Sequence, residues 1–172
     1  FIDFKHADVA NVLLVPEMFK PLLEVAGSGM DLTPTVRSIV KLMGFDSFMC
    51  GFSSTPRPNR NAQLYVFTTL PREWAQIYDD EAYIEIDPRI QLVYDRSTMV
   101  VWSAEDLYGK SPRLNRFLGD AARFGVRSGA CFTLHDVNHN GVLVCYNSSR
   151  QRVDVELVER NLGTLYAFGT HF

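Results

Sequence analysis

The chain has 172 residues, of which 47% are hydrophobic, and this length suits one domain spanning residues 1–172 better than two. Its formal net charge is -3, with acidic and basic residues interspersed, so the sequence lacks the basic surface that binds nucleic-acid phosphates. We expect a cytoplasmic protein without a membrane contact, because no apolar run approaches the roughly 18 residues of a membrane span and the N-terminus lacks a signal-peptide pattern.

The N-terminal part is predicted to contain a helix followed by two strands. Residues 1–30 are weakly patterned, and we expect a helical or extended lead-in there. Residues 31–44 begin with a capping residue and a proline, carry apolar residues at helical spacing and end in glycine, which predicts an amphipathic helix. The runs 47–53 and 63–69 are rich in aromatic and β-branched residues and predict neighbouring strands, joined by a loop over 55–61.

The middle of the chain is predicted to be mainly helical. A helix should begin near Pro71, and the segment from there to Tyr94 is apolar without clean periodicity, with Pro88 breaking or starting a helix. Residues 100–102 predict a short strand. Residues 114–125 carry an apolar stripe at helical spacing that a glycine ends, so this helix should pack one face inward.

The C-terminal part is predicted to be a hairpin and a long helix. The apolar runs 130–135 and 142–146 lie on either side of Asn140-Gly141, which is a strong turn signal, and they predict two paired strands. From 153 to 168 the apolar residues return at helical intervals, which predicts one long amphipathic helix that forms either core or dimer surface.

This order of elements shows no regular alternation of strands and helices. We therefore expect an α+β fold, an α-β-α sandwich whose central, mostly antiparallel sheet of about five strands is flanked by helices on both faces.

One series of residues resembles a known family. Over about sixty residues the sequence carries an aromatic pair four apart, an Asp-Pro pair, a Trp-Ser pair and two glycines four apart. In this order and spacing it is similar to the autoinducer-binding domain of LuxR-type quorum-sensing transcription factors. The residues are Trp74, Tyr78, Asp87, Pro88, Trp102, Ser103, Gly125 and Gly129.

The resemblance implies a receptor for an N-acyl homoserine lactone, with no other cofactor. It also implies a homodimer and a C-terminal helix-turn-helix domain, absent from this chain, through which alone the protein would contact DNA. In the family the first Trp donates its indole N–H to the lactone carbonyl, the Tyr reaches the amide carbonyl, and the Asp accepts the amide N–H. We assign these roles to Trp74, Tyr78 and Asp87, whose side chains offer the required donors and acceptor.

Other positions are assigned to the walls of the same pocket. Trp102 should pack against the lactone ring, while Pro88 and Gly129 shape the backbone. The acyl tail is expected to contact a set of mostly small or apolar residues, namely Met49, Phe117, Ala121, Val126 and Cys131.

The chain departs from the family at three ligand positions. Leu70 stands where many members have Tyr, Ala75 where some long-chain receptors have Arg, and Cys145 at or beside a common Ser or Thr, where it replaces a polar contact by a weak thiol donor. These changes leave tail length and substitution open.

Competing interpretations remain. Aromatic residues four apart also pack in cores, and Asp-Pro often simply begins a helix. A PAS- or GAF-like sensor of another small apolar signal is the main alternative. An enzyme would need Asp87 as base and Cys131 or Cys145 as nucleophile, but no His accompanies either thiol and no metal-ligand spacing occurs. We therefore expect neither catalytic nor metal-binding residues.

Overall fold

The computed structural model describes residues 16–53, 64–94, 98–135 and 141–171. The N-terminal elements are η2 (Glu17–Phe19), α1 (Lys20–Ser28), α2 (Thr33–Leu42), β1 (Ser47–Ser53) and β2 (Leu64–Thr68). The middle elements are α3 (Arg72–Asp80), η3 (Tyr83–Glu85), α4 (Pro88–Tyr94), β3 (Val100–Ser103) and α5 (Pro112–Arg123). The C-terminal elements are β4 (Ser128–His135), β5 (Gly141–Ser148), α6 (Val155–Arg160) and α7 (Leu162–His171).

Within the described residues, the strands form one five-stranded sheet in the order β2-β1-β5-β4-β3. Every neighbouring pair is antiparallel. The two predicted strand pairs are confirmed as β1 with β2 and β4 with β5. The non-local pairing of β1 with β5 joins the two halves of the chain, placing Met49 opposite Cys145.

Successive residues of a strand point to opposite faces of the sheet, and here each face has its own core. On β4, Ala130 and Phe132 belong to one cluster, whereas Cys131 belongs to the other. Phe48 and Met49 on β1 divide in the same way. We call these faces the α2 side and the α3 side, after the helices that cover them.

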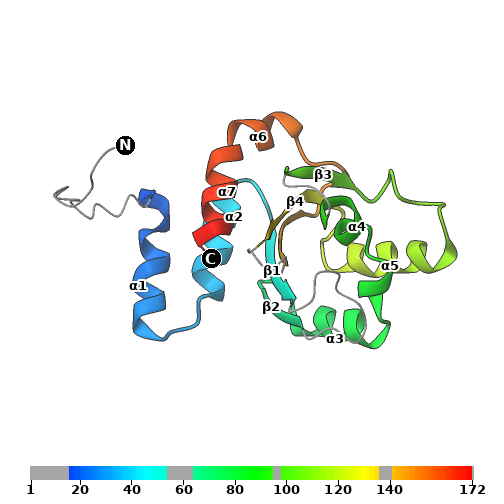
Figure 1. The fold of residues 1–172 in the computed structure, drawn as a ribbon, viewed down its shortest axis with the longest axis horizontal. Coiled ribbons are helices and arrows are strands. Elements are labelled where there is room, and N and C mark those ends of the chain that lie inside the picture. The colour runs from blue at the N-terminus through cyan, green and yellow to red at the C-terminus, as the bar shows by residue number, and fades with distance from the viewer. Residues whose placement is uncertain (1–15, 54–63, 95–97, 136–140, 172) are drawn as a thin grey trace, which may run out of the picture.

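Helices cover both faces, as predicted. Figure 1 shows α1, α2 and α7 on one side of the sheet and α3, α4 and α5 on the other. The α2 side is a closed core, in which the Phe168 ring of α7 lies 5.2 Å from those of Phe19 and Phe48. The predicted α+β sandwich is therefore the observed fold.

Local signals account for several helix ends. Asp31 Oδ1 accepts a hydrogen bond from the Thr33 N–H at 2.9 Å, at the start of α2. Ser111 caps α5 by accepting from the Leu114 N–H at 3.1 Å. Gly125 adopts a φ of 77° just after α5, a conformation that glycine takes without strain. The predicted helix near Pro71 and the helix start at Pro88 correspond to α3 and α4.

The prediction of one long C-terminal helix is wrong. Residues 155–171 form α6 and α7, which break at Asn161. The Asn161 amide donates to the Leu157 carbonyl at 2.9 Å, a side-chain bond that competes with the helical pattern. Leu165 and Phe168 of α7 are fully buried, so this helix face belongs to the core.

Some predictions concern segments only partly described. The lead-in is helical over 17–28, and residues 1–15 lie outside the described residues, as do the loop 55–61 and the Asn140 position of the predicted turn.

Candidate ligand-binding site

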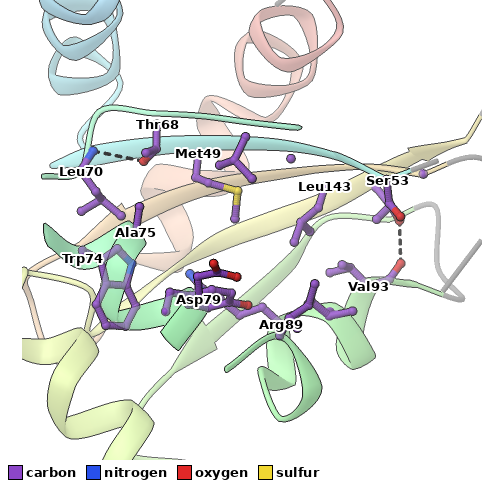
Figure 2. Close-up of a pocket in the computed structure, with 17 residues that line it drawn as sticks. Met49, Ser53, Thr68, Leu70, Trp74, Ala75, Asp79, Arg89, Val93 and Leu143 are labelled. Carbon is purple, nitrogen blue, oxygen red and sulfur yellow. Dashed lines mark hydrogen bonds between the residues drawn. The ribbon is translucent and has the colours of Figure 1, made fainter. Parts of the chain in front are cut away.

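A cavity of about 340 Å³ lies on the α3 side, between the sheet and the helices α3 and α4 (Figure 2). This volume falls within the range of small-molecule sites. The strands contribute Met49, Gly51, Ser53, Val66, Thr68, Thr133, Gly141 and Leu143, and Leu70 follows two residues after the end of β2. The helices contribute Trp74, Ala75, Tyr78, Asp79, Ile84, Arg89, Ile90 and Val93.

The helix α3 presents one face to the cavity. Trp74, Ala75, Tyr78 and Asp79 recur at helical spacing and all line the cavity wall. Trp74 and Tyr78 meet edge to face with ring centroids 5.8 Å apart. Trp74 is 4% exposed, and its ring also packs near Phe117, 6.2 Å away. The aromatic pair therefore packs in the core and also lines the cavity.

A buried ion pair lies beside these aromatic residues. Arg89 and Asp87 have side chains only 4% and 1% exposed, and Nη2 lies 2.6 Å from Oδ2. Arg89 Nε donates to both carboxylate oxygens, at 3.0 and 3.1 Å. Tyr78 also donates its hydroxyl to Oδ2 at 3.0 Å. Asp87 caps α4 as well, because Oδ1 accepts from the Arg89 backbone N–H at 2.9 Å.

The pKa shifts follow from this burial and pairing. Burial, followed by the charge of Asp87, raises the pKa of Tyr78 well above its ordinary value, so the phenol keeps its proton. Burial by itself lowers the pKa of Arg89, but the charge of Asp87 and the hydrogen bonds to it outweigh burial and leave the pKa raised. Arg89 is therefore a permanent cation in the cavity wall.

The site holds N–H donors that the protein itself does not use, while the Asp79 carboxylate also lines the cavity as an acceptor. Neither the Trp74 indole N–H at the cavity wall nor the buried Trp102 indole N–H has an acceptor among the described residues. A guanidinium has five N–H groups. For Arg89, three of these reach Asp87 or the Asn147 side-chain oxygen, which is 3.3 Å from Nη1. One N–H on each terminal nitrogen stays without an acceptor in the described structure, and Arg89 is one of the residues that line the cavity.

Three of the ten predicted ligand residues line the cavity, namely Met49, Trp74 and Tyr78. Asp87 lies behind Arg89 and is absent from the lining. The other six are buried on the α3 side and pack around the cavity without lining it: Trp102, Phe117, Ala121, Val126, Cys131 and Cys145. The Trp102 ring centroid lies 5.4 Å from the Arg89 guanidinium carbon, so Trp102 supports the cation.

The two positions expected to shape the backbone have a geometric reason. Pro88 is the first residue of α4. A Cβ at Gly129 would lie 2.1 Å from the Tyr146 carbonyl oxygen and 3.1 Å from Trp102 Nε1. Only glycine allows β3, β4 and β5 to approach this closely.

Two departures from the family pattern lie on the cavity wall. Leu70 and Ala75 both line it, so the wall is apolar where other members carry Tyr or Arg. The sequence analysis did not predict Arg89, Leu143 and Val93 as lining residues. Leu143 could have been predicted, because it lies two positions from Cys145 on the same strand face. The position of the charged Arg89 within an apolar segment was a further signal.

The thiols lack the features of a nucleophile. A hydrogen bond with Cys145, followed by burial, raises the pKa of Cys131 well above its ordinary value. Burial raises the pKa of Cys50 to about 11.

Among the described residues, no three His, Cys, Asp or Glu side chains gather as metal ligands. None of the helices in the described part of the chain is both long and apolar enough to span a bilayer.

Sequence comparisons place the chain among regulators. The profile of the family described as "Autoinducer binding domain" matches residues 31–172. Transcriptional activator protein AhyR of Aeromonas hydrophila is 27% identical over 118 residues, covering 67% of this chain and 45% of AhyR. Transcriptional activator protein SolR of Ralstonia nicotianae is 28% identical over 94 residues, covering 55% of this chain and 38% of SolR. The chain spans less than half the length of these curated relatives.

Structural comparisons agree on the fold. CepR2 from Burkholderia cenocepacia, described as an N-acylhomoserine lactone-dependent LuxR family transcription factor, matches with a TM-score of 0.68 and 24% identity, over 81% of this chain and 79% of that one. SdiA from E. coli matches with a TM-score of 0.59 and 15% identity, over 87% of this chain and 86% of that one. Since the family profile spans most of the chain and the fold agrees, the chain belongs to the autoinducer-binding domains of LuxR-type quorum-sensing regulators.

Proposed function

We propose that the cavity binds an N-acyl homoserine lactone as its signal. The observation that carries this proposal is the pairing of a mostly apolar cavity of about 340 Å³ with unused N–H donors on one wall. An acyl lactone offers an apolar tail and several carbonyl acceptors, which is the complementary chemistry. The lactone dependence of CepR2, a protein of similar fold, supports the same ligand class.

The residue roles follow from the lining. The Trp74 indole N–H donates to the lactone carbonyl, and Tyr78 packs beside the head group. The tail contacts apolar side chains of the sheet and of α3, among them Met49, Leu70, Ala75 and Leu143. The buried residues around the cavity keep its wall in shape, and these are Trp102, Phe117, Ala121, Val126, Cys131 and Cys145.

The domain is the sensing part of a longer transcriptional regulator in this proposal. Its relatives AhyR and SolR are named transcriptional activators, and each is more than twice as long as the region it shares with this chain. Ligand stabilises the folded domain by mass action and thereby controls dimerisation and the contact with DNA made by a separate helix-turn-helix domain. The protein acts in the cytoplasm as a homodimer and carries out no catalysis on its ligand.

Thermal unfolding with a panel of acyl homoserine lactones tests the proposal. The panel varies tail length and 3-position substituent, and the protein is first shown to be folded and free of co-purified ligand. Binding only to the folded state stabilises it by about 2.7 kcal/mol at a hundred-fold excess over Kd, so the melting temperature should rise saturably for one tail class. Absence of any shift across the panel would identify the domain as a sensor of a different molecule.

Recovery of the ligand tests the absence of catalysis. A lactone incubated with stoichiometric protein should be recovered unchanged, as judged by mass spectrometry. Accumulation of the ring-opened acid or of the free fatty acid above the rate in buffer would contradict this part of the proposal.

A further inference from the structure

The Asp87 carboxylate has no room for another donor. Oδ1 accepts from the Arg89 backbone N–H and from Nε, while Oδ2 accepts from Nε, Nη2 and the Tyr78 hydroxyl. Two carboxylate oxygens offer about four lone-pair directions, and these contacts use them. Asp87 is therefore satisfied within the protein before any ligand enters.

Separating Arg89 from Asp87 to admit a ligand N–H is unfavourable. Both side chains are almost completely buried, and removing one partner of a buried pair leaves an uncompensated charge. The guanidinium is also held between two rings, 5.4 Å from the Trp102 centroid and 5.9 Å from that of Phe117. Asn147 holds it from β5, and its own amide is oriented by donating to the Ser47 hydroxyl at 3.2 Å. The pair thus holds Arg89 in a fixed position in the wall.

On the Arg89 side, the cavity wall therefore offers hydrogen-bond donors. Figure 2 shows Arg89 on the side of the cavity opposite Met49 and Thr68. Its two unused N–H groups are the charged donors of this wall, and the carboxylate that lines the cavity is that of Asp79 on α3, whereas Asp87 does not line it. A hydrogen bond from a cation to a carbonyl oxygen is about twice as strong as a neutral one.

We propose that Arg89 determines head-group specificity by donating to a carbonyl oxygen of the ligand, so that recognition does not require the ligand's amide N–H. Asp87 then acts as a positioning residue that orients Arg89. In acyl esters of a hydroxylactone an oxygen replaces the amide nitrogen. Such esters bind with an affinity similar to that of the amides. This inference rests on the proposed function, because it concerns the same cavity and the same lactone class.

The charge balance disfavours anionic ligands. Asp87 and Arg89 together carry no net charge and the Asp79 carboxylate also lines the cavity, so a carboxylate ligand would leave its negative charge uncompensated in a mostly apolar cavity. Ring-opened acyl homoserine should therefore bind far more weakly than the closed lactone.

The first experiment measures the affinity of the unaltered protein for two matched ligands by calorimetry. One is the acyl homoserine lactone that stabilises the protein most, and the other is its ester counterpart with the same tail. The two dissociation constants should agree within about three-fold, because neither ligand loses a hydrogen bond to Asp87. An ester that binds roughly ten-fold more weakly than the amide, or worse, overturns the inference and leaves the proposed function intact. If neither ligand binds, the proposed function fails as well.

The second experiment removes both charges together, since either single change leaves a buried ion. The double variant Asp87→Asn/Arg89→Met should lose about ten-fold or more in affinity for the amide and the ester alike. A loss confined to the amide would show that Asp87 reads the N–H, and unchanged affinity for both would show that Arg89 contributes nothing. Either result overturns the inference.

A matched control separates these effects from general destabilisation. Glu85 and Arg113 form an exposed ion pair with side chains 39% and 49% exposed, and neither lines the cavity. The double variant Glu85→Gln/Arg113→Met should bind both ligands as the unaltered protein does. Unfolding curves for both variants establish the folded fraction. If the Asp87→Asn/Arg89→Met protein does not fold, the comparison of amide and ester in the unaltered protein still tests the inference.

Discussion

At the scale of single residues, one carboxylate serves the backbone and a side chain at once. Asp87 caps α4 through the Arg89 N–H and also holds the Arg89 guanidinium. The Asp-Pro pair therefore begins a helix, and the same Asp87 side chain holds Arg89, which lines the cavity. The two tryptophans differ in position: Trp74 lines the cavity, whereas Trp102 lies against Arg89.

Replacing Trp74 by Phe tests the proposed lactone donor. Trp74→Phe keeps an aromatic ring against Phe117 and removes the indole N–H, which has no acceptor among the described residues. Loss of one hydrogen bond costs about 1 kcal/mol, which is roughly five-fold in lactone affinity by calorimetry. The same substitution at Trp102 is the control, and it should lower the melting temperature with a smaller effect on affinity. Equal affinity losses in the two variants would contradict the assignment.

At the scale of elements, side-chain hydrogen bonds join strand β1 to the end of β5, in addition to the backbone hydrogen bonds between the two strands. Asp46, just before β1, accepts hydrogen bonds from the Ser149 backbone N–H at 2.7 Å and the Ser149 hydroxyl at 2.8 Å. Partial burial acts to raise the pKa of Asp46, but these hydrogen bonds, with smaller contributions from Ser148 and Arg150, leave it below its ordinary value of 3.8. The ionised carboxylate thus stabilises the pairing of distant strands.

The sign of this shift predicts a pH dependence. A carboxyl whose pKa is lowered by folding contributes stability above its unfolded-state pKa and loses it as the pH falls through the folded-state pKa. Asp46→Asn should therefore lower the free energy of unfolding at pH 7, and the difference from the unaltered protein should shrink as the pH falls below the ordinary value of 3.8. Urea unfolding at several pH values measures this. Asp80→Asn is the control, because it changes an exposed carboxylate that makes no hydrogen bond within the described part of the chain. Asp154→Asn would not serve, because Asp154 caps α6. A difference that persists unchanged at low pH would contradict the role of the ionised form.

At the scale of the whole molecule, one sheet separates a closed core from a core with a cavity. The α2 side is filled by interlocking aromatic rings, including Phe48, Tyr146 and Phe168. The α3 side leaves about 340 Å³ empty beside Met49. Because the same strands supply both faces, ligand binding on one side should stabilise the whole domain.

Two methionines allow the two sides to be compared with one substitution. Met43 is 1% exposed in the closed core, while Met49 lines the cavity. Met43→Ala should cost about 2–5 kcal/mol of stability and leave the preferred tail length unchanged. Met49→Ala should cost less and move the preference in the lactone panel towards longer tails, because it enlarges the cavity. An altered tail preference in Met43→Ala, or an unaltered one in Met49→Ala, would contradict this division of the two faces.

The sequence by itself determined most of the elements and one helix face of the cavity wall, but not the break between α6 and α7. Helical spacing put Trp74 and Tyr78 on the same side of a helix, and the strand runs predicted both pairs of neighbouring strands, because these signals depend on residues close together in the chain. The tertiary structure decided which predicted residues reach the cavity. Phe117, Ala121 and Cys145 were assigned to the ligand from the sequence, yet they pack behind the wall. Only one residue separates Asp87 from Arg89 in the sequence. Arg89 nevertheless needs distant residues to cover Asp87, because Trp102, Phe117 and Asn147 enclose its guanidinium. The charge of Asp87 offsets the desolvation of Arg89, but whether the side chain turns inward also depends on the distant residues that enclose it.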